Sequence, residues 1–295
     1  MKFKNILSII GVSILSTGLI GCGGTPEAKT KETNWDIVKT VENTKANANN
    51  IGGFLNENFG ITVGYAGEVH YTTDGGETWP KGTNQSLCRF GLDILNENLA
   101  WNCGNGANVR KTTDGGKTWQ KVTDFGESRP NHCRYLSFLD ENTGWIAAPK
   151  KLGSTTDGGQ TWLTLTLPSD IKEITAIDLL DKNTGYLVDT NNKLYITNDG
   201  GLTWTNKPIN IDNLNNLVWS TNESIIRFTD KDNGIFFYYG TDNKLKCSIT
   251  KNSGDTWEEQ VMPDVHGLGL FLTPDGKYLS VNAPSGEAIT LLKQK

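Results

Sequence analysis

The sequence predicts an all-β fold, a six-bladed β-propeller whose ring closes when the N-terminal strand joins the C-terminal blade. Three observations support this prediction. An octapeptide of the type TTDGGxTW recurs along the chain, a hairpin pattern precedes each copy, and strand patterns that do not complete a blade remain at both ends. Repeats of about 40–45 residues with four strands each are typical of propeller blades.

The composition agrees with a strand-rich protein. The 295 residues include 33 Gly and nine Trp but only two Met. Gly and Trp favour tight turns and strands over helices. The 28 basic and 33 acidic side chains give a formal net charge of −5, which does not provide the basic face that nucleic-acid binding requires. We therefore expect no nucleic-acid partner.

Residues 1–21 have the layout of a secretory signal peptide. Lys2 and Lys4 precede an apolar stretch from Ile6 to Ile20, and small residues follow it. Such a segment is too short and wrongly flanked to be a permanent membrane span. The sequence therefore predicts an exported protein.

The four residues LIGC that end at Cys22 resemble the lipobox of bacterial lipoproteins. The resemblance implies cleavage before Cys22, a diacylglyceryl thioether on its sulfur, and a chain that is lipid-anchored at the extracytoplasmic face of a bacterial membrane. The alternative is an ordinary cleaved signal with a chance cysteine. Residues 22–33, which are polar, are then expected to form a flexible tether.

Residues 34–295 are expected to form the propeller, and their two ends predict how it closes. NWDIVKTV at 34–41 looks like the last strand of a blade, with no octapeptide before it. Three strand patterns lie within 267–293 with no octapeptide after them. Together they complete a sixth blade, and the ring leaves no exposed sheet edge. Six blades over this range give about 44 residues each, which agrees with the repeat length.

A second signature lies upstream of each octapeptide. Examples are FLNENFGITVG at 54–64 and FLDENTGWIAA at 138–148. An apolar pair, a polar turn with Asn and Gly, and an alternating apolar run form a hairpin pattern. Adding the short strand before the octapeptide and the Trp-led strand after it gives the four strands of a blade.

The octapeptide itself is interpreted as a structural turn. Its two glycines allow positive φ angles, its Asp can accept hydrogen bonds within the turn, and its Trp can pack on the neighbouring sheet. Copies are spaced by 40, 43, 42 and 53 residues. The residues concerned are Asp74, Trp79, Asp114, Trp119, Asp157, Trp162, Asp199 and Trp204, with Asn252 and Trp257 in the most divergent copy.

The octapeptide pattern is similar to the Asp-box, or BNR repeat. A metal site is the alternative interpretation, but calcium takes six to eight oxygen ligands and each copy offers one carboxylate on a separate blade. The three histidines have no metal-ligand spacing either. We therefore expect neither a metal nor a cofactor.

Four cysteines remain in the mature chain: Cys88, Cys103, Cys133 and Cys247. An exported protein can keep disulfides. Cys88 and Cys133 open two successive repeats at nearly the same position, so a Cys88–Cys133 bridge is the preferred pairing. Free buried thiols are the alternative.

No catalytic constellation is evident in the sequence. Sialidases are also six-bladed Asp-box proteins, but they have an RIP-type segment ahead of the first box, and the residues before Asp74 contain no Arg. No GxSxG motif is present. We therefore expect a protein that is not an enzyme, and a carbohydrate-active propeller, either a glycosidase or a lectin-like glycan binder, is the alternative.

From about residue 49 to 262, the combined hairpin and octapeptide pattern resembles the Ycf48-like family. Its members are exported Asp-box propellers, often lipid-anchored, and the founding ones assist assembly of photosystem II. The resemblance implies a scaffold that binds a protein or peptide without catalysis. The founding members have seven blades and a basic surface patch, and this chain departs from both. The residues chosen as partner contacts are Arg89, His132, Arg134 and Tyr135.

Overall fold

The computed structural model describes residues 33–44, 51–64, 67–83, 90–104, 108–125, 132–212, 214 and 224–295. Within these ranges all regular structure is β-strand, as the sequence predicts. None of the described residues forms a helix of the length and apolarity needed to cross a bilayer. The signal peptide, the tether and Cys22 lie outside the described residues, so these assignments stay predictions.

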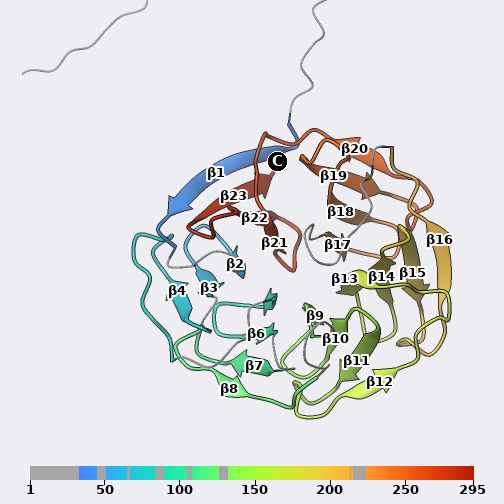
Figure 1. Ribbon diagram of the computed structural model, residues 1–295, viewed down its shortest axis with the longest axis horizontal. Helices are drawn as coiled ribbons and strands as arrows, with labels where there is room; N and C mark the ends of the chain where they lie inside the picture. The colour runs from blue at the N-terminus through green and yellow to red at the C-terminus, as the bar shows by residue number, and fades with distance from the viewer. Residues whose placement is uncertain are drawn as a thin grey trace, which may run out of the picture. The chain divides into compact units, whose positions relative to one another are not determined.

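Six antiparallel sheets surround a central channel and form the blades of a propeller (Figure 1). The first blade is β2 (Ile51–Phe54), β3 (Gly60–Val63) and β4 (Val69–Thr72), with a single bridge from His70 to Lys81 in place of an outer strand. The second is β5 (Gly91–Ile94), β6 (Ala100–Cys103), β7 (Val109–Thr112) and β8 (Gln120–Lys121). The third is β9 (Tyr135–Phe138), β10 (Gly144–Ala148), β11 (Lys151–Thr155) and β12 (Leu163–Leu165).

The remaining blades follow the same order. The fourth is β13 (Ile174–Leu179), β14 (Gly185–Asp189), β15 (Lys193–Thr197) and β16 (Thr205–Pro208). The fifth is β17 (Ile225–Phe228), β18 (Gly234–Tyr239), β19 (Leu245–Thr250) and β20 (Glu258–Gln260). The sixth is β21 (Gly269–Leu272), β22 (Tyr278–Asn282), β23 (Ala288–Gln294) and, as its outer strand, β1 (Trp35–Glu42).

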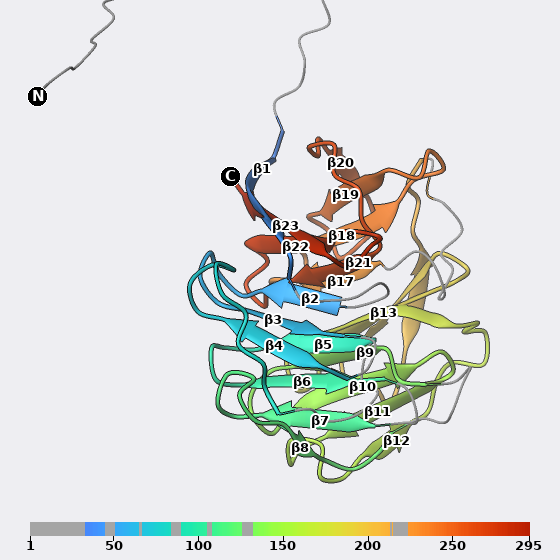
Figure 2. The ribbon, with the colours of Figure 1, turned by 60° about the vertical axis from the view of Figure 1, so that its left-hand side comes forward.

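The ring closes through β1, as the unpaired strand patterns at the two ends predict. β1 pairs antiparallel with β23, from Trp35 opposite Gln294 to Glu42 opposite Ala288. Both ribbon views show the two strands side by side (Figures 1 and 2). The Trp35 ring packs edge-on against Phe237 of the fifth blade at a centroid distance of 5.3 Å. Trp35 thus fills the place that the box tryptophans take in other blades.

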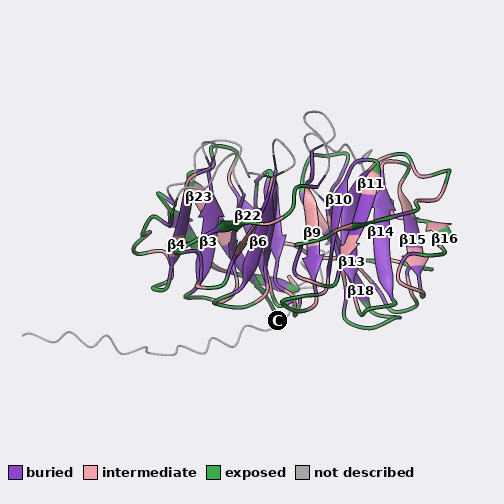
Figure 3. Cartoon of the chain, turned by 90° about the horizontal axis from the view of Figure 1, so that it is seen from below, coloured by how far each residue is buried: buried purple, intermediate pink, exposed green. Residues whose placement is uncertain are grey.

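The strand order gives the propeller two different faces (Figure 3). On one, which we call the box face, each octapeptide lies beside the first hairpin turn of its own blade. The N–H of Gly158, for example, donates to the carbonyl of Asn142 at 2.8 Å, and Gly115 and Asn98 do the same at 2.9 Å. The opposite face, the loop face, carries the connections that lead into the innermost strands. Because β1 begins and β23 ends at the box face, both ends of the propeller lie there.

The blades are held together by large side chains between neighbouring sheets. The Trp101 ring stacks on Phe138 of the next blade at 3.7 Å, and Tyr186 stacks on Phe228 at 3.6 Å. A Cβ on Gly185 would come within 2.2 Å of the Trp145 ring, so only glycine leaves room there. Trp101 and Trp145 are therefore buried packing residues.

Candidate functional site

The repeated aspartates cap their own turns. In the third copy, Asp157 Oδ1 accepts the Thr161 N–H at 2.9 Å and the Thr155 hydroxyl at 2.8 Å, and Oδ2 accepts the Thr161 hydroxyl at 2.6 Å. The Gly159 N–H donates to Thr155 Oγ1 at 2.9 Å. Asp74, Asp114 and Asp199 make the same set of bonds. Every carboxylate oxygen in these copies is used inside the turn.

These hydrogen bonds stabilise the charged carboxylate. The Thr161 hydroxyl, the Thr161 N–H and the Thr155 hydroxyl together lower the pKa of Asp157 to about 2. The corresponding threonines, Thr203 first, lower the pKa of Asp199 to about 2. A carboxyl with so low a pKa is a poor general acid at neutral pH.

The box glycines and tryptophans face the preceding blade. Both glycines of the four intact copies have φ between 73° and 94°, where a Cβ would be strained. Gly159 lies against Val122, and the Trp162 Nε1–H donates to the Thr123 carbonyl at 3.1 Å. The boxes therefore connect adjacent blades.

The most divergent copy keeps the same geometry with an amide. Asn252 Oδ1 accepts the Thr256 N–H at 2.9 Å, and Nδ2 donates to the Thr256 hydroxyl at 2.9 Å. Since an amide replaces the carboxylate, the turn does not need the negative charge. Among the described residues, no group of three or more His, Cys, Asp or Glu side chains is placed to hold a metal ion.

The Cys88–Cys133 bridge is absent from the structure. Cys133 is a buried free thiol whose sulfur points to the carbonyls of Gly104 and Asn108, at 3.7 and 3.8 Å. Cys88 lies outside the described residues. Cys247, in the fifth blade, is also a buried free thiol.

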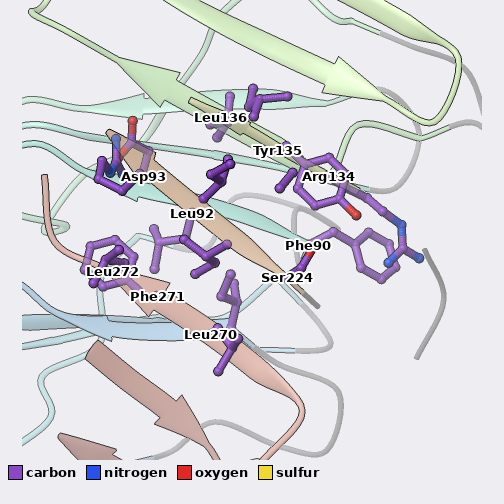
Figure 4. Close-up of a pocket in the computed structure, with 16 residues that line it drawn as sticks. Phe90, Leu92, Asp93, Arg134, Tyr135, Leu136, Ser224, Leu270, Phe271 and Leu272 are labelled. Atoms are coloured by element: carbon purple, nitrogen blue, oxygen red, sulfur yellow. The ribbon is translucent and has the colours of Figure 1, made fainter. Parts of the chain in front are cut away.

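A small cavity occupies the central channel (Figure 4). Its volume is about 70 Å³, room for a few water molecules. The wall is mostly aliphatic and comes from the innermost strands, with Leu92, Leu136, Ile177, Leu270 and Leu272 among its residues. Figure 4 shows Phe90 and Arg134 at one end of this cavity and Asp93 at the other.

We call the loop-face end of the cavity the channel rim. Two of the predicted contact residues, Arg134 and Tyr135, line the cavity here. The Arg134 guanidinium lies over the Phe90 ring at 4.6 Å, and the His132 ring also stacks on Phe90, at a centroid distance of 4.2 Å. His132 is only 2% exposed, so its ring is buried under the surface at the rim. Tyr135 is half-buried and lines the cavity. Arg89 lies outside the described residues.

Three charged residues on the innermost strands form the opposite end of the channel. Arg227 Nη1 donates to Asp178 Oδ1 at 2.8 Å, and the Phe228 N–H donates to Asp178 Oδ2 at 2.6 Å. Asp93 Oδ2 accepts the Phe138 N–H at 2.7 Å. These backbone bonds pass from one blade to the next, so the carboxylates also join blades.

Burial dominates the ionisation of both carboxyls. It raises the pKa of Asp93 to about 6, although the Arg227 charge and the Phe138 N–H act in the opposite direction. Burial also raises the pKa of Asp178, and Arg227 opposes this rise. Of these two carboxyls, Asp178 has a directly bonded cation and Asp93 does not.

Sequence reasoning missed these three residues and Phe90. A signal was present, since Asp93 in GLDI, Asp178 in ITAIDL and Arg227 in IIRF are single charges in otherwise apolar strands. A lone charge in a buried strand needs a partner, and its position would have pointed to the channel.

Family comparisons agree with the octapeptide geometry. The model of the BNR/Asp-box repeat matches residues 110–121. The chain is an Asp-box β-propeller. A second model, described as sortilin, neurotensin receptor 3, matches residues 150–270. No curated protein sequence matches this chain significantly.

Solved structures share the fold at low sequence identity. A structure of YCF48 bound to D1 peptide has a TM-score of 0.56 and 15% identity, covering 90% of this chain and 97% of that one. YCF48 from Cyanidioschyzon merolae has a TM-score of 0.50 and 17% identity, covering 88% and 98%. A catalytically inactive virginiamycin B lyase from Staphylococcus aureus with quinupristin has a TM-score of 0.53 and 15% identity, covering 81% and 78%. These neighbours share the β-propeller fold, and they include a lyase as well as a protein with a bound peptide.

Proposed function

We propose that this Asp-box propeller is a non-catalytic scaffold, lipid-anchored through Cys22, that binds a protein or peptide segment at the channel rim on the extracytoplasmic side of the membrane. The observation that carries the proposal is the stack of Arg134 on Phe90 at the rim. A guanidinium held over an aromatic ring keeps its donors in fixed directions, and Arg and aromatic residues are enriched at protein interfaces.

The channel itself argues against a substrate pocket. Its volume of about 70 Å³ is far below the roughly 300–1,000 Å³ of ordinary small-molecule sites. Both oxygens of Asp178 are occupied, by Arg227 and by the Phe228 N–H. Glycoside hydrolysis needs both carboxyls of a pair to reach the scissile bond, and Asp178 has no free oxygen for it. The carbohydrate-active alternative therefore gains no support from the channel.

The positions of the chain ends suit an anchored scaffold. β1 begins at the box face, opposite the rim, so the first described strand is joined to the preceding chain on that side. A lipid on Cys22 would then hold the box face toward the membrane and leave the loop face accessible. The neighbour bound to D1 peptide supports a peptide as the kind of partner.

Crosslinking on intact cells, followed by affinity capture of the full chain, tests the binding proposal. We expect a protein partner whose yield falls at least fivefold with Arg134→Ala, whereas Lys182→Ala, an exposed basic residue on the box face, leaves the yield unchanged. Equal capture by both variants would exclude the rim. Hydrolysis of a fluorogenic glycan panel by the wild-type protein would contradict the scaffold assignment.

The anchor has a separate test. Cys22→Ser should move the protein from the membrane fraction to the soluble exported fraction and abolish labelling by radioactive fatty acid. If the variant stays with membranes and the wild type takes up no label, the lipid anchor is wrong even where partner capture succeeds.

A further inference from the structure

The buried end of the channel contains an unusual combination of groups. Asp93 is 3% exposed, and its Oδ2 is bonded to the Phe138 N–H. Among the described residues, no hydrogen bond reaches its Oδ1, although the side chain borders the cavity. A buried carboxylate oxygen without a donor carries a large desolvation cost. The cavity beside it is therefore the place where a donor would be stabilising.

The charges around Asp93 determine which donor fits. Asp178 and Arg227 form a direct ion pair, so their charges balance and Asp93 contributes a net charge of −1. At the equivalent third position of three other innermost strands stand Gly53, Ser137 and Phe271, which carry no charge. At this end of the cavity an anion would meet uncompensated negative charge, whereas a single cation would balance Asp93. Arg134, which also lines the cavity, lies at the opposite end.

The walls determine the shape of that cation. Leu92, Leu136, Leu270 and Leu272 line the route from the rim to Asp93 with aliphatic groups. A cavity of about 70 Å³ suits a slender group better than a bulky one. An unbranched hydrocarbon with a charged end matches an aliphatic passage that ends at a carboxylate.

We propose that the channel is a binding site for an alkylammonium group, the chemistry found at the end of a lysine side chain, with Asp93 Oδ1 as its acceptor. The group enters from the rim, its methylene groups contact the leucines, and the ammonium donates to Asp93. This site does not depend on a partner docking at the rim, since a free alkylammonium ion is sufficient to occupy it.

Two probes, added to the intact mature protein, test the site and distinguish a free amine from a peptide lysine. They are n-butylammonium and Nα-acetyl-lysine N-methylamide, with the norleucine analogue as the uncharged control. Binding is measured by titration calorimetry and by the NMR shifts of leucine methyl groups. We expect both amines to bind at pH 8 and the norleucine analogue to bind at least tenfold more weakly. Binding of butylammonium alone would assign the site to free amines.

Asp93→Asn is the decisive variant, because its amide oxygen can still accept the Phe138 N–H and preserve the fold. We expect it to weaken amine binding at least tenfold, while Asp212→Asn, at an exposed carboxylate that does not line the cavity, binds like the wild type. Since the pKa of Asp93 is about 6, wild-type affinity should fall about tenfold between pH 8 and pH 5. No binding at pH 8, equal binding of norleucine, or unchanged binding by Asp93→Asn would each overturn the proposal.

Discussion

At the scale of single residues, the Asp-box gives a direct comparison between a carboxylate and an amide. Asp157 and Asn252 accept the same backbone N–H four residues on, in both cases at 2.9 Å. Asp157→Asn should therefore change the free energy of unfolding by less than about 1 kcal/mol, whereas Asp157→Ala should cost about 2 kcal/mol, because it leaves two hydroxyls and an N–H without an acceptor. Urea unfolding of both variants measures the difference. If Asp157→Asn and Asp157→Ala destabilise the protein equally, the hydrogen bonds of this side chain contribute little to stability.

The box carboxylates also predict the response to acid. The pKa of Asp157 and of Asp199 is about 2 in the folded protein and about 3.9 in an unfolded chain. A carboxyl with a depressed folded pKa stabilises the protein above the unfolded value, and this contribution disappears as pH falls through the folded value. Melting temperature should therefore drop between about pH 4 and pH 2. Asp157→Asn should show a smaller drop, and an identical acid profile would contradict this explanation.

The ionisation of Asp93 affects the pH dependence of stability in the opposite direction. Its folded pKa of about 6 exceeds the unfolded value, so its contribution to stability is fully present below about pH 4 and is lost as pH rises through 6. Asp93→Asn should therefore be more stable than the wild type at pH 8, by up to about 3 kcal/mol, and similar to it at pH 4. Chemical denaturation at the two pH values measures this difference. A variant that is less stable at pH 8 would mean that the buried charge is well compensated.

At the scale of strands and blades, Trp35 tests how the ring is closed. It is 1% exposed and packs on Phe237, Leu279 and Leu292 of the fifth and sixth blades. Trp35→Ala should destabilise the protein by about 3–5 kcal/mol, because it leaves a large cavity between these blades. Trp35→Phe should cost less, since it retains part of the packing. A cost below 1 kcal/mol for Trp35→Ala would mean that β1 contributes little to closure.

The strands could be predicted from the sequence because the same pattern recurs in each blade. Each blade repeats the pattern of turns, and Trp35 carries the tryptophan signal into a strand without an octapeptide. The charged residues of the channel were harder to predict from sequence, because they are single residues on strands far apart in the chain. Asp178 and Arg227 are 49 positions apart and belong to different repeats, so no local pattern connects them. Phe90 precedes a strand, where an apolar residue is unremarkable.

At the scale of the whole molecule, the closure between β1 and β23 offers a site for a covalent link. Thr40 and Thr290 are directly paired, with their Oγ1 atoms 3.1 Å apart. Replacing both with cysteine should give a disulfide that closes nearly the entire propeller, with a gain on the order of 5 kcal/mol in the chain-entropy treatment. The oxidised variant should melt well above its reduced form. Equal melting temperatures would show that the ring does not open at this seam when the protein unfolds.

The same closure sets an order of events during biosynthesis. β1, the first strand of the propeller to be synthesised, pairs with β23, the last one, since Trp35 lies opposite Gln294. No partial chain can finish the circle, however many intermediate repeats have already formed, and contacts between such distant segments form slowly. A nascent polypeptide therefore keeps an open seam until the last strand has been made, and truncation before Ala288 would leave β1 without its pairing strand.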